Sequence, residues 1–183
     1  MDALQAYKIG FTGLTKGKHR FSFEIGADFF DCFEQSEIHQ GKVSLILDLE
    51  KEENMLVFGF AITGWVELLC DRCLDNYREP VEQQHRIYVK FGDVYSEPAE
   101  EVVVIPHSDS SFDVSHYVYE FLHLGLPMRR IHHDLENGGS GCDQDMLRRA
   151  EALSPGSKPS GHEEMPGNSP FEALKQLRFN KKK

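Results

Sequence analysis

Two cysteines three residues apart, Cys70 and Cys73, form the local pattern with the clearest chemical potential in the 183-residue chain. Two thiolates at this spacing in a tight turn can hold one tetrahedral zinc ion through bonds of about 2.3 Å. A closed structural site needs two more ligands, and the sequence offers His132 or His133 together with Cys142. The pattern therefore predicts a candidate structural zinc site made of Cys70, Cys73 and Cys142 with either His132 or His133.

The same two thiols admit other interpretations. They can form a tight turn with no ligand role, or catalyse thiol–disulfide exchange. Redox motifs of this kind stand between a strand and a helix in a βαβ unit, whereas Cys70 and Cys73 fall among predicted antiparallel strands. A metal-dependent hydrolase would need an open zinc position and a nearby base. Cys32 lies in a Phe-rich stretch and is expected in the core or on a helix face, with no ligand role.

Other signatures of catalysis are missing from the sequence. It contains no Gly-x-Ser-x-Gly turn, no phosphate-binding Gly-rich loop with a lysine and no His-Glu-x-x-His motif. Its carboxylates fall in acidic runs such as 97–101, which are typical of solvated faces. His116 and His123 flank the apolar stripe of a predicted helix and are expected to be boundary residues. The sequence therefore predicts a protein that is not an enzyme.

The first hundred residues are predicted to be mostly β. Alternating or continuous apolar runs indicate strands at 19–25, 43–49, 55–62 continuing through 65–68, 85–91 and 102–105. The run 55–62 is almost wholly apolar and predicts a strand covered on both faces. Gly64 marks a bulge or a close backbone approach. These strands predict an α+β fold, mainly an antiparallel meander or a partly open barrel.

The apolar period changes after Phe112 and predicts a packed helix at about 113–124. Asp113 is expected to be the N-cap, and Phe112 is expected to staple onto Tyr117. Gly125 and Pro127 end the pattern. The apolar face of this helix consists of Val114, Tyr117, Val118, Phe121 and Leu122. Because the helix is short, it must pack on the sheet to be stable.

The chain is expected to divide into a domain at 1–153, a flexible linker at 154–169 and a basic amphipathic helix with its tail at 170–183. A second, weaker helix is predicted at 143–153. The linker is rich in Pro, Gly and Ser and has no apolar pattern. Ser169, Pro170 and Glu172 together form a helix-start signal. The terminal helix would dock on a partner or pack back on its own domain.

Charge is distributed unevenly over a chain of net charge −10. The segment 171–183 carries one acid and five basic residues, so the other 170 residues carry −14. An acidic body binds polyanions poorly, but this basic end could contact phosphate or simply be solvated. The candidate partner-binding residues are Arg72, Lys175, Arg178, Lys181, Lys182 and Lys183. No membrane span or secretory signal is evident, and the protein is expected in the cytoplasm.

Several segments, taken in order, resemble the YceD family. The most specific is Cys-Asp-Arg-Cys-Leu at 70–74, and the tail around Pro170 is similar but less diagnostic. The resemblance covers about residues 5–146. It is carried by 13–19, 29–30, 37–38, Gly64, 70–74, 89–92, 118–121 and 126–132.

The resemblance implies a role in accumulating 23S ribosomal RNA during large-subunit biogenesis, with no known catalysis. Typical members carry a cysteine cluster after the Leu-Pro segment, where this chain has only Cys142 with His132 and His133 nearby. This departure excludes a four-cysteine site and leaves the mixed set of Cys70, Cys73, His132 and Cys142 as the candidate. The expected partner is a ribosomal protein, an assembly factor or large-subunit rRNA. A zinc-stapled interaction module outside ribosome assembly is the alternative.

Overall fold

A computed structural model describes residues 3–34, 36–135 and 138–154. The chain separates into two compact units, Met1–Asp143 and Gln144–Lys183. The described part of the second unit contains α3 (Gln144–Leu153), close to the helix expected at 143–153. The first unit contains η1 (Ala3–Tyr7), β1 (Lys8–Gly10), β2 (Gly17–Ile25), α1 (Ala27–Phe30), β3 (Gly41–Lys51), β4 (Met55–Leu69), β5 (Asn76–Gly92), β6 (Ser96–Ala99), β7 (Val102–Pro106), β8 (Ser111–Asp113) and α2 (Ser115–Leu124).

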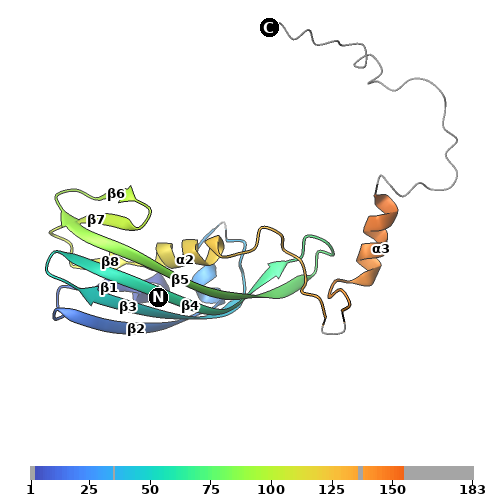
Figure 1. Cartoon of the computed structure of the whole chain (residues 1–183), viewed down its shortest axis with the longest axis horizontal. Helices are drawn as coiled ribbons and strands as arrows, with labels where there is room; N and C mark the ends of the chain where they lie inside the picture. Colours follow the sequence, from blue (N-terminus) through green and yellow to red (C-terminus); the bar gives the residue numbers. More distant parts are fainter. Residues whose placement is uncertain (1–2, 35, 136–137, 155–183) are drawn as a thin grey trace, which may run out of the picture. The chain divides into compact units, whose positions relative to one another are not determined.

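Six strands form one open sheet in the order β2-β3-β4-β5-β7-β6 (Figure 1). Strands β2 to β5 are an antiparallel meander, whereas β7 pairs with β5 in parallel and with β6 antiparallel. The short β1 and β8 pair separately. The α+β class is confirmed, and the sheet does not close into a barrel. The parallel pairing of β7 with β5, the placement of β6 outside β7 and the separate β1–β8 pair depart from the expected meander.

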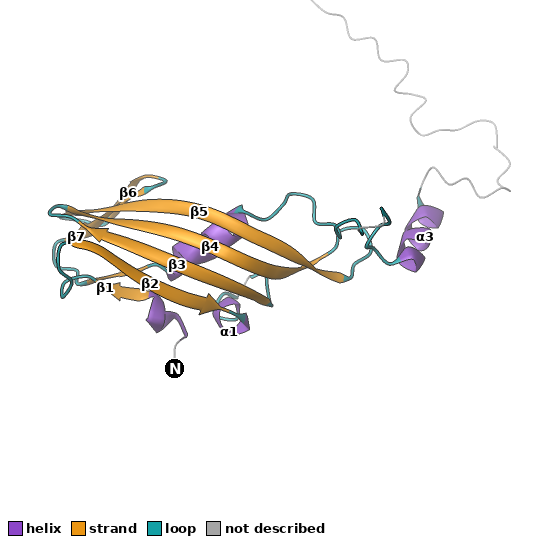
Figure 2. Cartoon of the chain, turned by 60° about the horizontal axis from the view of Figure 1, so that its bottom comes forward, coloured by secondary structure: helices purple, strands orange, loops and turns teal. Residues whose placement is uncertain are grey.

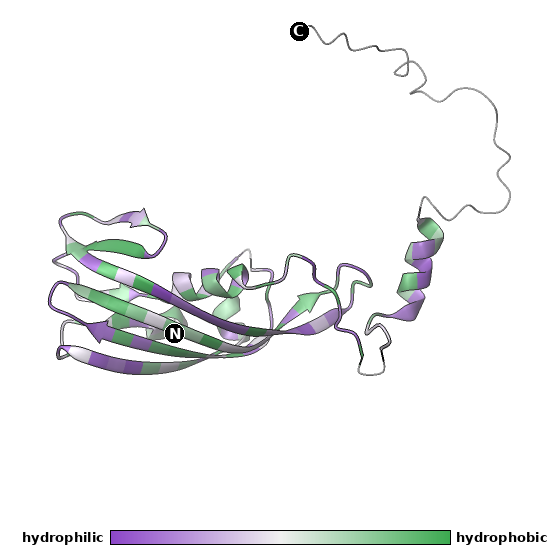
Figure 3. Cartoon of the chain, viewed as in Figure 1, coloured by the Kyte–Doolittle hydropathy of each residue, from purple (hydrophilic) through white to green (hydrophobic). Residues whose placement is uncertain are grey.

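One face of the sheet carries the core. Alternate residues of each long strand point to this face, so that Leu47 of β3 pairs with Phe60 of β4 and both are buried. Helix α2 packs against this face through Val118 and Leu122, both fully buried. Phe121 of α2 places its ring 5.1 Å from that of Phe60. The predicted packing of this helix on the sheet is therefore confirmed, and Figure 3 shows the alternation along the strands.

The other face of the sheet is open. Met55, Val57, Gly59 and Ala61 of β4 point to it and are half-buried, while their neighbours in sequence are buried on the core face. The expectation that 55–62 is covered on both faces is therefore wrong. The strand is apolar on its outer side because its residues there are small or lie beside long cross-strand side chains, not because another layer covers them.

Helix α2 begins two residues later than expected. Val114 is the N-cap and Asp113 is the last residue of β8. The Asp113 carboxylate nevertheless accepts a hydrogen bond from the Ser115 backbone N–H at 2.9 Å and from its hydroxyl at 2.7 Å. The Asp113 side chain therefore accepts hydrogen bonds from the first residue of α2, although Asp113 itself belongs to β8. The staple is confirmed, since the rings of Phe112 and Tyr117 stack 5.5 Å apart.

Gly64 lies at a close approach of β3 and β4. Its φ is +151°, and a Cβ there would overlap the Lys42 carbonyl and lie 2.7 Å from the Cα of Val43. The pairing of β3 with β4 continues through this point without a register shift. Of the two expectations for Gly64, close approach is confirmed and a bulge is not seen.

The hairpin of β4 and β5 projects beyond β3. The pairing of β3 with β4 stops at Gly41 and Val66, whereas that of β4 with β5 continues to Leu69 and Asn76. At the tip, Leu74 has a φ of 62°, in the left-handed region that glycine usually occupies, and its side chain is 60% exposed. None of the described helices is long and apolar enough to span a membrane.

Replacing Gly64 by alanine should destabilise the protein. The new Cβ meets backbone, which cannot move aside, and the φ is unfavourable, so we expect a loss of about 2 kcal/mol in the free energy of unfolding. Gly59→Ala is the matched control on the same strand, because a Cβ there lies 3.7 Å from the Asp48 carbonyl oxygen. Urea denaturation of both variants checks this. Equal stability of the two would contradict the close-approach argument.

Replacing Leu74 by glycine should stabilise the protein. The exposed leucine loses little packing, and relief of the left-handed backbone is worth about 1 kcal/mol. Leu74→Val should act oppositely, since a β-branched residue tolerates positive φ poorly. Chemical denaturation of the two variants measures the difference. A less stable Leu74→Gly protein would mean that the leucine side chain contributes through contacts.

Candidate metal centre

The tip of the β4–β5 hairpin holds two of the predicted ligands. The backbone N–H of Cys70 donates to the Asp75 carbonyl at 2.9 Å, and that of Leu74 donates to the Cys70 carbonyl at 3.0 Å. These bonds close a tight turn in which Cys70 and Cys73 are 0% and 1% exposed. The left-handed Leu74 allows the chain to reverse directly after the second thiol.

The chain that follows α2 is fastened to this turn by backbone hydrogen bonds. The Asp71 N–H donates to the Arg130 carbonyl at 2.7 Å, and the Arg130 N–H donates to the Asp71 carboxylate at 2.8 Å. The Arg130 guanidinium also forms an ion pair with Glu37 at 2.5 Å. His132 follows two residues later and so reaches the thiols, although it is 59 residues from Cys73 in sequence.

Cys142 reaches the cluster through a second reversal of the chain. Asp134 and Ser140 form an isolated antiparallel β-bridge, and the Cys142 N–H donates to the Ser140 hydroxyl at 3.2 Å. Gly141 packs against the preceding segment so closely that a Cβ would lie 2.6 Å from the His133 carbonyl oxygen. The Cys142 side chain is buried beside Cys70.

The structure brings all four predicted ligands together. The three thiol sulfurs and one imidazole nitrogen lie within 4.8 Å of one another. The Sγ atoms of Cys70 and Cys142 are 3.8 Å apart, and Cys73 Sγ is 3.4 Å from Nδ1 of His132. Tetrahedral zinc, with bonds of about 2.3 Å to sulfur and 2.0–2.1 Å to nitrogen, requires separations of about 3.8 and 3.6 Å. The donor set and its spacing fit a zinc ion.

His133, the alternative fourth ligand in the sequence, has another role. Its Nε2 lies 3.3 Å from the Glu79 carboxylate, and its ring centroid is 6.0 Å from that of Tyr77. The Tyr77 ring also packs against His132 at 5.3 Å. Burial, with the nearby Glu79 carboxylate, raises the pKa of Tyr77 to about 12. The Tyr77 ring thus packs against the His132 imidazole that faces the thiols. His133 instead contacts Glu79 and Tyr77.

The surroundings of Cys70 and Cys73 shift the pKa values of the two thiols in opposite directions. Burial tends to raise the pKa of Cys70, but backbone N–H donors from Cys73, Arg72 and His132 outweigh it and lower that pKa to about 6. Burial raises the pKa of Cys73, and its sulfur contacts with Cys70 and Cys142 raise it further. Once one thiolate exists, a second is costly beside it. A central cation removes this conflict, because it stabilises every thiolate at once.

Neither Arg72 nor Cys32 contributes a ligand atom to this cluster. Arg72 is exposed at the turn and makes no ion pair within the described residues. Cys32 is exposed rather than buried in the core, and its thiol donates to the Asp28 carbonyl at 3.2 Å. The predicted linker after Ser154 and the basic residues Lys175, Arg178, Lys181, Lys182 and Lys183 lie outside the described residues.

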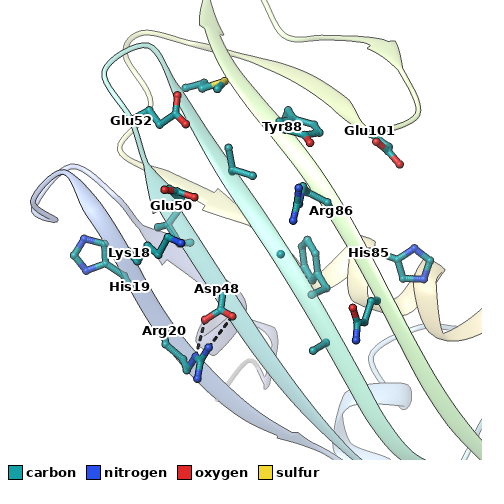
Figure 4. Close-up of a pocket in the computed structure, with 17 residues that line it drawn as sticks. Lys18, His19, Arg20, Asp48, Glu50, Glu52, His85, Arg86, Tyr88 and Glu101 are labelled. Atoms are coloured by element: carbon teal, nitrogen blue, oxygen red, sulfur yellow. Dashed lines mark hydrogen bonds and ion pairs between the residues drawn. The ribbon is translucent and has the colours of Figure 1, made fainter.

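A broad, shallow depression lies elsewhere, on the open face of the sheet (Figure 4). It includes a paired Arg20 and Asp48, with Nε to Oδ1 at 2.6 Å, and the unlike charges Lys18 and Glu50 nearby. The hydrogen bond from Arg20 lowers the pKa of Asp48. Its lining contains no cysteine, serine or threonine to act as a nucleophile. Sequence reasoning missed this surface because its lining residues come from strands spread over the chain from Lys18 to Glu101.

Comparison with known proteins bears on the fold and the thiol cluster together. The family model described as "Large ribosomal RNA subunit accumulation protein YceD" matches residues 58–178, which include all four members of the cluster. No curated protein and no solved structure gave a significant match. The matched region runs from β4 through the hairpin tip and α2 to the C-terminal segment. The chain belongs to the YceD family of large ribosomal RNA subunit accumulation proteins.

Proposed function

We propose that the protein is a non-catalytic binding factor for large ribosomal subunit biogenesis, stapled by one structural zinc ion. Membership of the YceD family, which is described by large ribosomal RNA subunit accumulation, supports this role. The observation that carries the metal assignment is the convergence of Cys70, Cys73, His132 and Cys142 within 4.8 Å. The zinc would join the hairpin tip to the segment after α2.

The donor set favours a structural site over a catalytic one. Four protein ligands complete a tetrahedral zinc shell, whereas a catalytic zinc keeps a position open for water or substrate. Three of the four residues are buried, and only His132 is partly accessible. When bound, zinc supplies charge compensation and a cross-link. The protein supplies the four donors and the backbone N–H groups that point at the sulfur of Cys70.

The open-face depression gives no support for an enzyme. It presents charged groups already paired with each other, such as Arg20 with Asp48, and it lies on a different face from the buried thiols. A thiol–disulfide catalyst would need an accessible reactive sulfur, but Cys70 and Cys73 are 0% and 1% exposed. We therefore assign the molecule a binding role.

Charge supports a basic protein as the direct partner. The acidic body would attract a ribosomal protein or a basic assembly factor and repel bare phosphate. The exposed Arg72 and the five basic residues after 174 are the candidates for any contact with rRNA. Because ribosomes are assembled in the cytoplasm, we expect the protein to act there.

Elemental analysis of freshly purified protein should find one zinc per chain. Cys70→Ser and Cys142→Ser should each abolish it, because each removes one of four ligands from a closed site. Cys32→Ser is the matched control, since this exposed thiol lies outside the cluster and its loss should leave the zinc content unchanged.

The accessibility of the thiols separates a structural site from a redox site. With zinc bound, only Cys32 should react rapidly with an alkylating reagent, and addition of a chelator should expose three more thiols. Rapid alkylation of Cys70 before chelation, in protein that contains no metal, would contradict the zinc assignment and favour a redox catalyst.

Binding to large subunits should depend on the basic C-terminal residues. A chain that ends at residue 169 should co-sediment less with free large subunits, and the remaining binding should depend less on salt. A full-length variant with Gln at Lys175, Arg178, Lys181, Lys182 and Lys183 is the matched control for chain length. If both proteins bind as the parent does, the basic end has no role in binding, and the acidic body must carry the contact alone.

A further inference from the structure

The two edges of the six-stranded sheet differ sharply. The β6 edge is short, contains Pro98, and has a register irregularity against β7 between Ser96 and Ala99. These are the features with which proteins prevent edge-to-edge pairing. The β2 edge has none of them. It is nine residues long, contains no proline, and pairs with β3 in unbroken register.

The β2 edge is also free within the described part of the chain. No other strand of residues 3–34, 36–135 or 138–154 pairs with its outer side (Figure 2). A depression runs beside the second half of this edge, with Ser22, Phe23 and Glu24 among its lining residues. The aromatic rings of Phe21 and Phe23 are half-exposed on the core side of the sheet. The edge therefore has room for another strand and apolar area for that strand to cover.

The sequence of β2 is complementary to itself when read antiparallel. With Phe21 placed opposite Phe21 of a second copy, Lys18 stands opposite Glu24, and Glu24 opposite Lys18. On the core side the same register places His19 opposite Phe23. Opposite charges and aromatic pairs at directly facing positions are the contacts that stabilise neighbouring antiparallel strands.

We propose that β2 is a homodimer interface, at which two copies of this chain pair their β2 strands antiparallel about a two-fold axis at Phe21. The two six-stranded sheets then join into one continuous sheet. An isologous contact of this kind is the commonest way in which identical chains associate. The pairing also satisfies the backbone N–H and C=O groups that a free edge leaves to water.

The alternative registers are less favourable. A shift that centres the pair on Arg20 places two guanidinium groups opposite each other, which is repulsive. A shift that centres it on Ser22 places Arg20 opposite Glu24, but Arg20 already forms a two-point ion pair with Asp48 of its own chain. That shift also leaves Lys18 without a facing residue in the strand. The Phe21 register is the only one of the three that uses all nine residues of β2.

A charge swap tests the dimer and its register. Sedimentation equilibrium of the full chain should show a dimer. Glu24→Lys should raise its dissociation constant about tenfold, because it creates two like-charge pairs with Lys18 at once. The double variant Lys18→Glu with Glu24→Lys should restore the parent dissociation constant, since the facing charges are again opposite. Urea denaturation of both variants confirms that each is folded.

Hydrogen exchange locates the contact. Alternate amides of β2, those that point away from β3, should be protected in the parent and should lose protection in Glu24→Lys. A monomeric parent chain would overturn the proposal. A dimer that Glu24→Lys leaves unchanged would also overturn it, by placing the contact elsewhere. Protection that appears only when a second protein is added would show that the edge binds another strand and not a copy of this chain.

Discussion

The pairing of β4 with β5 is the interaction on which the rest of the molecule depends. These strands are 15 and 17 residues long and stay in register along the whole of β4. In its middle, this ladder provides the part of the core face where Phe60 packs against Phe121 of α2. At its tip, it places Cys70 and Cys73 beyond the reach of β3. A one-residue slip would move every core residue of β4 to the open face and both thiols out of alignment.

The tip of a long hairpin has little core to stabilise it, and the molecule compensates there by cross-links. The Asp71 N–H donates to the Arg130 carbonyl, the Arg130 N–H donates to the Asp71 carboxylate, and the Arg130 guanidinium pairs with Glu37. Three thiols and an imidazole then converge beside these bonds. Such a cluster is unfavourable without a cation, since thiolates repel one another when buried. A zinc ion bound there would make the same cluster a strong link between segments far apart in sequence.

The two faces of the sheet divide the work of the first unit. The core face is closed by α2, η1, α1 and the small β1–β8 sheet, and aromatic contacts such as that of Tyr7 with Phe23 join these pieces. The open face carries paired charges and small residues. The two edges of the sheet also differ from each other. One edge is protected by a proline and an irregular register, and the other is regular and self-complementary. This difference between the edges is why the proposed association uses β2 and not β6.

Sequence periodicity was a good guide wherever one face of an element is buried. The alternation at 43–49 and the helical stripe through Val118 and Leu122 predicted β3 and α2 within a few residues. Prediction from periodicity failed for segments whose residue types are not set by burial on one face. The first half of β5 was missed because Arg78, Glu79 and Pro80 lie near the exposed end of the hairpin. The strands β1 and β8 were missed because three residues are too few to show a period.

By itself, the sequence determined the ligand types, the strand and helix periods, the acidic body and the family to which the chain belongs. Local residue chemistry sets all of these. Only the tertiary structure showed that His132 lies beside the thiols while His133 contacts Glu79, because this placement depends on the crossing of two segments about sixty residues apart. The same holds for the open face of β4 and the free edge of β2. An apolar residue specifies that it can be buried, but the arrangement of all the strands determines which face and which edge are left uncovered.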